Sequence, residues 1–217
     1  MKSGWDRERV RIGALVDESA ARPVPQRLHG EMTKRAFDVL FALLVLPVAA
    51  VLILVSAVAI AITDPGPVVH WSERVGRDNR RFRMAKLRTM KVGCPDVATH
   101  LLVDRDQWVT RVGRVLRALS LDELPQFFHV LRGDMSLVGP RPALHNQDDL
   151  VSLRTKAGVH RLRPGLTGLA QISGRDELSV EEKVELDQRY LAERNLFFDV
   201  KVLLRTIVPV ISGRSLV

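Results

Sequence analysis

Two adjacent carboxylates are the residues best placed for chemistry. Asp122 and Glu123 follow Ser120 in the stretch Ser-Leu-Asp-Glu-Leu-Pro, in a chain with 33 Lys and Arg against 25 Asp and Glu. Carboxylates beside fixed cations stay ionised. An ionised carboxylate can bind Mg²⁺ or attack phosphorus as a nucleophile. Adjacent side chains on a helix diverge by about 100°, so we expect the two acids to hold different roles.

A structural interpretation of the same residues stays open. Ser120 and Glu123 have the spacing of a capping box, and acids in a first helical turn interact favourably with the helix dipole. The catalytic interpretation depends on nearby cations. The arginines within a few turns of the acidic pair are Arg111, Arg114, Arg117 and Arg132.

Arg141 lies between two prolines, in the run Gly-Pro-Arg-Pro at 139–142. The prolines restrict the backbone on both sides, so the guanidinium would be displayed with little freedom. Such an arginine suits bidentate recognition of phosphate, and an exposed loop arginine is the alternative. Asp134, just before this run, is either a second acid of the site or a turn residue.

A glycine-rich stretch, residues 165–174, is a further candidate anion site, because glycines let backbone amides approach an anion closely. Arg163 and Arg175 flank it. Lys86 and Arg88 would place two more cations on one face of an extended segment. The six histidines show no metal-ligand spacing.

An uncharged apolar run from Val39 to Ile62 leads into these motifs. As a helix, its roughly 24 residues could cross a bilayer core of about 30 Å. Pro47 removes a helix hydrogen bond, and Lys and Arg, which mark the cytoplasmic side of a membrane helix, flank both ends. We therefore expect a re-entrant membrane helix over residues 31–64, broken near Pro47. A single span and a buried soluble helix are the alternatives.

The remaining patterns predict a mainly α protein with a small β element. We expect residues 1–30 to form a flexible polar tail and residues 65–217 to form a compact cytoplasmic α/β catalytic domain with amphipathic surface helices. A β-hairpin is expected between residues 67 and 90, with its turn at 76–79. A capping box at Ser179 predicts a helix to about Glu193. Residues 199–211 form an amphipathic surface helix, which either lies on the membrane or packs on the domain.

The amino-acid composition limits the classes of molecule that this protein is expected to bind. A formal charge of +8 and a pI of about 10.3 suit nucleic acid, anionic lipid or a phosphorylated substrate. The apolar run favours the last two, and an aromatic content of 5% leaves few platforms for stacking bases, so we expect no nucleic acid. Cys94 is the sole cysteine, which excludes an internal disulfide and fits a reducing, cytoplasmic location.

Together these motifs resemble the bacterial sugar transferase family, the monotopic phosphoglycosyl transferases that prime glycan assembly on polyprenyl phosphate. The resemblance covers roughly residues 33–214 and depends on several long motifs in the family's order. They are Lys-Arg-x-Phe-Asp at 34–38, Lys-Leu-Arg-Thr-Met at 86–90, SLDELPQ at 120–126, VLRGDMSLVGPRP at 130–142, RPGLTGLAQISGR at 163–175 and Leu-Asp-x-x-Tyr at 186–190.

The resemblance implies transfer of a sugar 1-phosphate from a UDP-sugar to undecaprenyl phosphate, with release of UMP. Asp122 would be the nucleophile, would form a phosphosugar-aspartyl intermediate and would bind Mg²⁺. Glu123 would assist the incoming polyprenyl phosphate or position Asp122. The family's apolar segment is re-entrant and broken at a Ser-Pro pair, where this chain has Leu46-Pro47. The candidate phosphate-binding cations are Lys86, Arg88, Arg117, Arg141, Arg163 and Arg175.

The resemblance also predicts a location and partners. The protein would sit at the bacterial inner membrane, with its catalytic domain on the cytoplasmic face and in contact with lipid. It would initiate exopolysaccharide, capsule, O-antigen or glycoprotein glycan assembly. Glucose, galactose and N-acetylated amino sugars all stay open as the transferred sugar, and an amphipathic surface is compatible with a homodimer. The alternative function is a non-catalytic, basic membrane-surface scaffold of a glycan-assembly complex.

Overall fold

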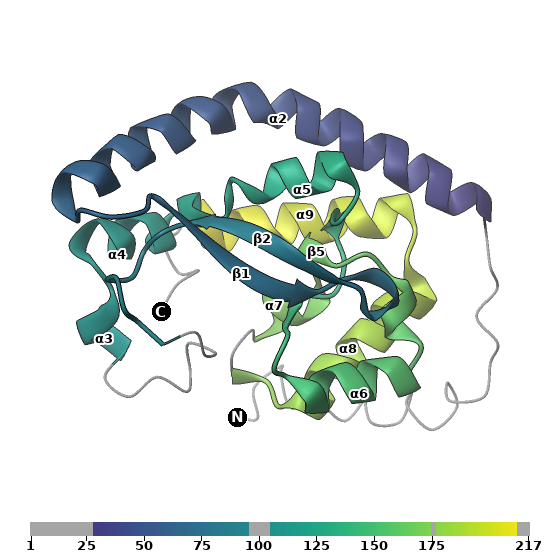
Figure 1. Ribbon diagram of the computed structural model, residues 1–217. Helices are drawn as coiled ribbons and strands as arrows, with labels where there is room; N and C mark the ends of the chain where they lie inside the picture. The colour runs from purple at the N-terminus through teal and green to yellow at the C-terminus, as the bar shows by residue number, and fades with distance from the viewer. Residues whose placement is uncertain (1–27, 96–104, 175–176, 212–217) are drawn as a thin grey trace, which may run out of the picture.

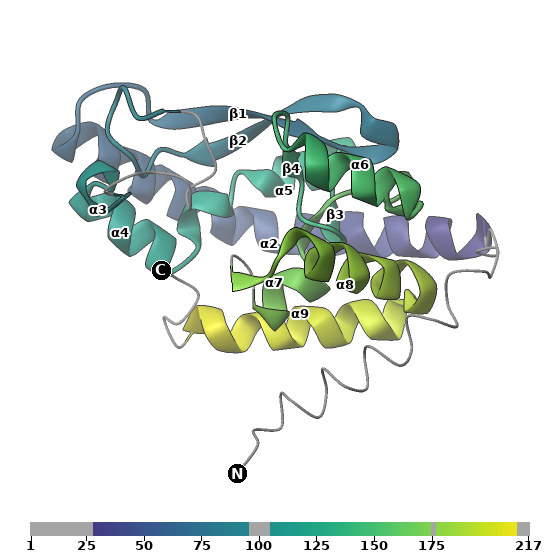
Figure 2. The same ribbon diagram turned by 90° about the horizontal axis from the view of Figure 1, so that it is seen from below.

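A computed structural model of the 217-residue chain describes residues 28–95, 105–174 and 177–211. This part is mainly helical with two small sheets, as the sequence predicts. One long helix, α2 (Leu28–Thr63), arches over the rest of the molecule, which forms a compact domain beneath it (Figure 1). The strands β1 and β2 lie on one side of this domain, and helices α8 and α9 lie on the opposite side (Figure 2).

Helix α2 continues through Pro47 without interruption, so the expected break near Pro47 is wrong. The helix bows instead of folding into a hairpin (Figure 1). Packing explains the difference, because both halves of the helix rest on the domain. Ala42 and its neighbours join the main core, and Ile60 joins a second core with Leu87 and Leu116. These contacts on either side of the proline hold one helical axis despite the lost hydrogen bond.

Charged side chains fix the N-terminal turns of α2 to the domain. Lys34 donates to Asp199 at 2.7 Å, and Asp38 accepts from the Ser136 hydroxyl at 2.8 Å. The Arg35 guanidinium donates to the carbonyls of Val130 and Leu131 at 2.6 and 2.8 Å. These carbonyls belong to the last turn of another helix, where the Val130 carbonyl also accepts from the Gly133 N–H at 3.2 Å, so Arg35 adds to the C-terminal cap.

Arg88 fixes the other end of α2. Its side chain is 7% exposed, donates to the carbonyls of Asp64 and Pro65, and forms an ion pair with the Asp64 carboxylate at 3.6 Å. Both ends of α2 therefore lie against one domain. The prediction that Arg88 binds substrate phosphate is at odds with this geometry, because its guanidinium is occupied by the loop that follows α2.

The expected hairpin is confirmed. Strands β1 (Val69–Val75) and β2 (Arg81–Leu87) pair antiparallel, with the 3-10 turn η1 (Arg77–Asn79) between them. The short strand β4 (Ala143–Leu144) pairs antiparallel with β1, which gives the order β2-β1-β4. A second sheet joins β3 (Ser136–Val138) and β5 (Gly165–Thr167) in parallel.

The helices of the domain are mostly short. Helix α8 opens at the expected capping box, in which the Ser179 hydroxyl and the Glu182 carboxylate each bond the other's backbone N–H. Helix α9 packs Val202 into the core but leaves Phe197 80% and Leu204 60% exposed. The helical segments are α3 (Arg105–Trp108), α4 (Arg111–Ala118), η3 (Leu121–Glu123), α5 (Gln126–Arg132), α6 (Asp148–Lys156), η4 (Val159–Arg161), α7 (Leu169–Ser173), α8 (Val180–Glu193) and α9 (Leu196–Ile211).

The structural role of Arg88 gives a first prediction. Arg88→Gln removes a buried charge-assisted contact set, so we expect the free energy of unfolding to fall by about 1–3 kcal/mol. The measurement is urea unfolding of the detergent-solubilised protein. Arg81→Gln is the matched control, because Arg81 is 60% exposed and its pair with Glu73 spans 3.7 Å. Unchanged stability together with weaker binding of a phosphorylated substrate would restore Arg88 as a phosphate ligand.

Candidate active site

Asp122 and Glu123 lie in the single 3-10 turn η3, which a sharp bend in the backbone sets up. Ser120, just after α4, has a φ of 54° in the left-handed region that a residue other than glycine seldom adopts. Its side chain makes no cap hydrogen bond, so the capping-box interpretation of Ser120 and Glu123 is wrong. The bend instead buries Asp122 to 8% exposure. Strained backbone of this kind clusters at functional sites.

Glu123 connects three segments that lie far apart in the sequence. Its Oε1 accepts from Lys86 Nζ at 2.7 Å and from Arg141 Nη2 at 3.1 Å. Lys86 comes from β2, Glu123 from η3 and Arg141 from the loop between β3 and β4. The side chains of Lys86 and Glu123 are 16% and 14% exposed, whereas the Arg141 side chain is more accessible to solvent, at 36%.

The charges around Asp122 oppose each other. Burial raises the pKa of the Asp122 carboxyl, and the Lys86 ammonium is the largest influence in the other direction. Glu123 adds to the rise, while Arg117 and Arg141 oppose it. Burial also lowers the pKa of Lys86, against the attraction of Glu123. The site is therefore a tightly packed group of desolvated charges, and perturbed carboxyl and amine pKa values of this kind favour a catalytic role.

Arg117 is positioned by the way α4 begins. The Thr110 hydroxyl caps this helix by accepting from the Gly113 N–H at 2.8 Å. A Cβ at Gly113 would lie 2.1 Å from the Thr89 carbonyl oxygen, so only glycine permits this approach. Arg117, one turn further on, then donates from Nε to the Thr89 hydroxyl at 2.9 Å. From this position its positive charge opposes the rise in the pKa of Asp122.

A buried ion pair fixes the backbone of Arg141. Arg154 donates from Nε and Nη2 to Asp187 at 2.9 and 2.7 Å, and from Nη1 to the Arg141 carbonyl at 2.8 Å. Burial raises the pKa of Asp187, and Arg154 opposes this rise. The glycine-rich stretch contributes too, because a Cβ at Gly165 would lie 2.1 Å from the backbone nitrogen of Gly139. These contacts hold the backbone of the loop at Arg141 and Gly139, and the preorganised display of the Arg141 guanidinium stays a prediction.

His129 positions the strand that carries Lys86. Its Nε2 accepts from the Ala85 N–H at 3.1 Å, and its Nδ1 lies 3.1 Å from Asp134. Because Nε2 accepts, the proton of the neutral ring is on Nδ1 and points to Asp134. Asp134 also accepts from Arg132 at 2.6 Å. Asp134 therefore supports the site indirectly, by holding His129 in place. We do not assign it as a second acid of the site.

The family model for bacterial sugar transferases matches residues 29–213, which is most of the chain. The chain belongs to this family. The match includes the η3 turn, the Arg141 loop and helix α2, so the geometry described above is that of a family member.

Curated relatives agree with this assignment. A UDP-glucose:undecaprenyl-phosphate glucose-1-phosphate transferase of Caulobacter vibrioides is 43% identical over 195 residues, which cover 85% of this chain and 72% of that protein. The exopolysaccharide production protein ExoY of Rhizobium meliloti is 37% identical over 216 residues, 92% of each chain. A UDP-N-acetylgalactosamine-undecaprenyl-phosphate N-acetylgalactosaminephosphotransferase of Aeromonas hydrophila is 37% identical over 210 residues. This chain spans only about half of that protein, 49% of its length.

The structure brings together five of the residues predicted for this family member's site: Lys86, Arg117, Asp122, Glu123 and Arg141. Two others lie elsewhere. Arg88 is buried at the C-terminal end of α2, and Arg163 donates to the Gly133 carbonyl at 3.1 Å near the N-terminal end. Arg175 lies outside the described residues. The supporting roles of His129 and Arg154 were not predicted, because only their long-range contacts reveal them, and Asp187 was singled out only as part of the Leu-Asp-x-x-Tyr motif, with no role assigned.

The raised pKa of Asp122 gives a second prediction, on stability. An unfolded aspartate titrates near pH 3.9, and the folded state keeps the proton to a higher pH. The free energy of unfolding should then fall as the pH rises from the unfolded value through the folded one. Asp122→Asn cannot ionise, so we expect it to be more stable than the parent at neutral pH and equally stable near pH 3.

Urea unfolding across this pH range measures the difference. Asp148→Asn is the control, since Asp148 is exposed in the first turn of α6 and should show no such trend. Lower stability of Asp122→Asn at neutral pH would mean that the surrounding cations stabilise the carboxylate more than burial destabilises it.

Proposed function

We propose that this protein transfers a sugar 1-phosphate from a UDP-sugar to undecaprenyl phosphate and releases UMP. The observation that carries the proposal is the acidic pair, the buried Asp122 and the partly buried Glu123, set among Lys86, Arg117 and Arg141. Cations preorganised around a carboxylate suit a reaction in which one phosphorus passes between anionic groups. The names of the relatives at 37–43% identity support the same donor and acceptor.

In the first step, the Asp122 carboxylate would attack the phosphorus that bears the sugar. The bond from this phosphorus to the UMP oxygen would break, and UMP would leave with the electron pair. The product is a phosphosugar-aspartyl anhydride. In the second step, a phosphate oxygen of undecaprenyl phosphate would attack the same phosphorus and release the Asp122 carboxylate. Dividing the transfer in this way lets two anionic substrates react in turn rather than together.

Glu123 has a positioning role in this scheme. It holds Lys86 and Arg141 within hydrogen-bond distance of one carboxylate oxygen, beside Asp122. When phosphate groups enter, these cations can pair with them instead, because phosphate offers the same kind of charge-assisted acceptor. Among Lys86, Glu123 and Arg141, the Arg141 side chain is the most exposed, at 36%. An incoming substrate would therefore meet Arg141 first.

We propose that Mg²⁺ binds at this site together with the substrate. Such ions commonly bind one or two carboxylates, with substrate phosphates and water as the other ligands. Asp122 would supply the carboxylate oxygen, and Glu123 adjoins it. Among the described residues no group of three or more His, Cys, Asp or Glu could hold a metal. The remaining ligands would therefore come from the UDP-sugar and water, and the bound ion would neutralise charge on the diphosphate.

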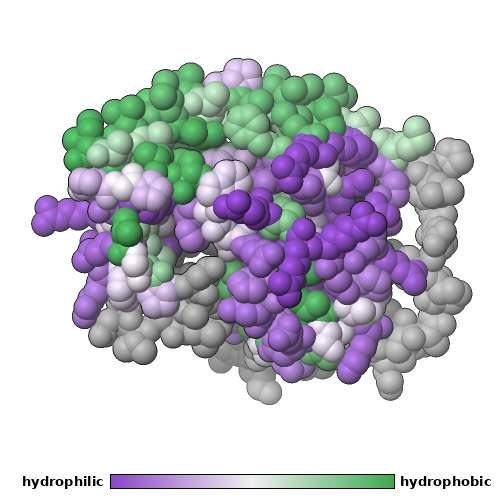
Figure 3. Space-filling model, viewed as in Figure 1, coloured by the Kyte–Doolittle hydropathy of each residue, from purple (hydrophilic) through white to green (hydrophobic). Residues whose placement is uncertain are grey.

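Helix α2 supports a membrane-surface location for the site. It is the one described helix long and apolar enough to cross a membrane by length and composition. Its outward face forms the apolar ridge along the upper edge of Figure 3. Exposed side chains of this ridge include Leu40, Leu43, Leu44, Val48, Val51, Leu54, Val55, Val58 and Ile62.

The contacts at both ends of α2 bear on its orientation. Lys34 near the start and the Asp64 segment after the end both bind the same domain. A helix that crossed a hydrocarbon core of about 30 Å would carry one end away from this domain. We propose that α2 lies along the cytoplasmic face of the inner membrane with its ridge in one leaflet. Turn η3 contacts α2, so the Asp122 site would face the headgroup level, where the acceptor phosphate lies.

A relative of matching length supports a pathway for the product. ExoY of Rhizobium meliloti, which aligns over 92% of both chains, is named an exopolysaccharide production protein. We therefore propose exopolysaccharide assembly as the pathway that uses the product.

UMP release tests the proposed reaction. We expect the detergent-solubilised protein, with undecaprenyl phosphate and Mg²⁺, to release UMP from one member of a panel of UDP-hexoses and UDP-N-acetylhexosamines. Asp122→Asn removes the nucleophile, so the rate should fall by about 10⁴-fold or more. Asp148→Asn, an exposed acid on α6, should keep the parental rate.

Parental turnover by Asp122→Asn would contradict the assignment of the nucleophile. UMP release from no nucleotide sugar, together with retained binding of undecaprenyl phosphate, would favour the scaffold alternative instead.

A further inference from the structure

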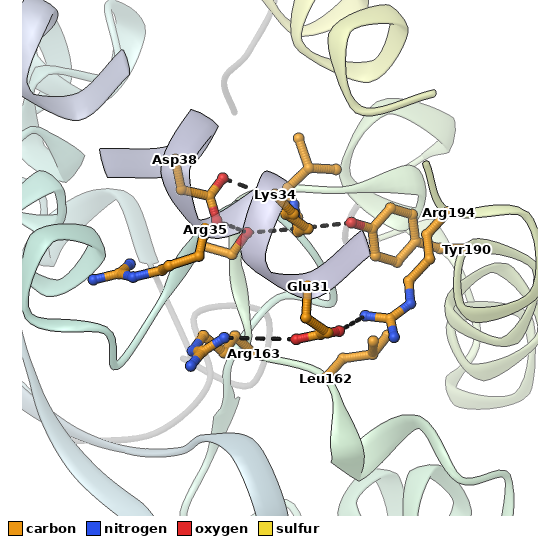
Figure 4. A pocket seen from close by; sticks show the side chains of 10 residues that line it. Glu31, Lys34, Arg35, Asp38, Leu162, Arg163, Tyr190 and Arg194 are labelled. Atoms are coloured by element: carbon orange, nitrogen blue, oxygen red, sulfur yellow. Dashed lines mark hydrogen bonds and ion pairs between the residues drawn. The ribbon is translucent and has the colours of Figure 1, made fainter. Parts of the chain in front are cut away.

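A second group of charges lines a pocket under the N-terminal end of α2, at the opposite end of this helix from α4 (Figure 1). Its charged lining residues are Glu31, Lys34, Arg35, Asp38, Arg163 and Arg194. They come from the first turns of α2, from the segment before β5 and from the end of α8. Figure 4 shows the Glu31 carboxylate between the guanidinium groups of Arg163 and Arg194.

Glu31 is shared among three arginines. Arg194 Nη1 lies 2.5 Å from one carboxylate oxygen, and Arg163 Nη1 and Arg77 Nη1 lie 3.7 and 3.9 Å from the other. The four side chains are 28–43% exposed, so solvent and a ligand can reach them. One carboxylate cannot give three guanidinium groups the bidentate pairing that each prefers.

Two of the neighbouring acids, Asp38 and Asp199, are already engaged by Lys34. Lys34 pairs with Asp199 at 2.7 Å and with Asp38 at 3.7 Å. Arg77 has a second partner in Asp78 at 3.6 Å.

Arg35 adds positive charge close by, and its own bonds go to neutral carbonyls. The pKa of the Arg163 guanidinium is lowered, first by burial and then by the positive charges of Arg77 and Arg35. Arginines therefore outnumber the carboxylates available to them here, and the pocket would gain from a further anion.

The position of this arginine cluster, defined as Arg77, Arg163 and Arg194, indicates what that anion is. On the outward face of the same helix, Met32 is 77% and Leu40 is 66% exposed, and these residues begin the apolar ridge. A basic pocket beside a membrane-embedded apolar surface is typical of a binding site for anionic lipid headgroups.

We propose that the arginine cluster binds the phosphate of an anionic phospholipid headgroup, and that Glu31 is the internal anion that competes with it. The inference rests on the proposed location of α2 at a bilayer surface. It concerns a site distinct from Asp122, because the cluster surrounds the first turns of α2, whereas Asp122 and Glu123 lie in turn η3, where Glu123 pairs with Lys86 and Arg141. The headgroup would fix the start of α2 in the plane of the membrane, while Arg88 fixes its end.

Vesicle binding by the full-length protein tests the proposal. The readout is the ratio of affinities for phosphatidylcholine vesicles with and without phosphatidylglycerol, since the ridge of α2 contributes equally to both. Arg163→Gln/Arg194→Gln should reduce this ratio about 25-fold, at roughly five-fold per cation near the surface. The matched control is Arg81→Gln/Arg189→Gln, which removes two exposed cations that pair with Glu73 and Glu193. The control should keep the parental ratio within about two-fold.

Glu31→Gln separates ligand binding from a purely structural role. If Glu31 competes with the headgroup, its neutralisation should raise the phosphatidylglycerol preference several-fold. If the cluster only fixes α2 to the domain, Glu31→Gln should weaken binding or leave it unchanged, and this result would overturn the proposal. Melting temperatures of all variants confirm that folded proteins are compared.

Two further outcomes would overturn the assignment in different ways. Inorganic phosphate that protects the lipid-free protein and fully displaces the vesicles would identify a soluble phosphate as the ligand. Absent binding to both kinds of vesicle would refute the membrane location of α2 itself, and the headgroup site with it, while leaving the UMP-release reaction standing.

Discussion

The buried charges around Asp122 can exist in the protein interior only as a group. A single desolvated carboxylate or ammonium would be strongly destabilising, and removing one partner of a buried pair leaves an uncompensated charge. Here Lys86 and Arg141 share one oxygen of Glu123, and Asp122 lies within the field of the same cations. Burial acts against ionisation of both Asp122 and Lys86, and their mutual attraction acts in favour of it. This balance makes the site sensitive to any added phosphate.

Much of the domain serves to hold that group in place. The β2 strand is fixed through His129 and Asp134, and the Arg141 loop through Arg154 and Asp187. In each case a buried polar side chain binds a backbone atom at or beside a site residue and is itself held by an acid. Supporting contacts of this kind preserve the productive geometry of a site. They also link the hairpin, α5, α6 and α8 into one structure around the η3 turn.

The sequence predicted the local features and missed the long-range ones. The β1–β2 hairpin and the capped start of α8 depend on neighbouring residues, and both are confirmed. The break predicted at Pro47 does not occur, because contacts on either side of the proline hold α2 to the domain. Such long-range contacts cannot be inferred from the sequence. Ser120 and Glu123 had capping-box spacing, but the left-handed backbone at Ser120 turned Glu123 to Lys86 and Arg141 instead. The cations of the motifs looked equivalent, yet Arg88 and Arg163 bind opposite ends of α2.

The central claim is that Asp122 carries the phosphosugar between two half-reactions. Intact-protein mass spectrometry after incubation with Mg²⁺ and the accepted UDP-sugar, without undecaprenyl phosphate, tests it most directly. The account predicts a mass increase equal to one sugar phosphate, located on Asp122, lost on addition of hydroxylamine or undecaprenyl phosphate, and absent from Asp122→Asn. Release of UMP that requires undecaprenyl phosphate from the first turnover, with no adduct at any time, would instead indicate direct transfer and contradict the account.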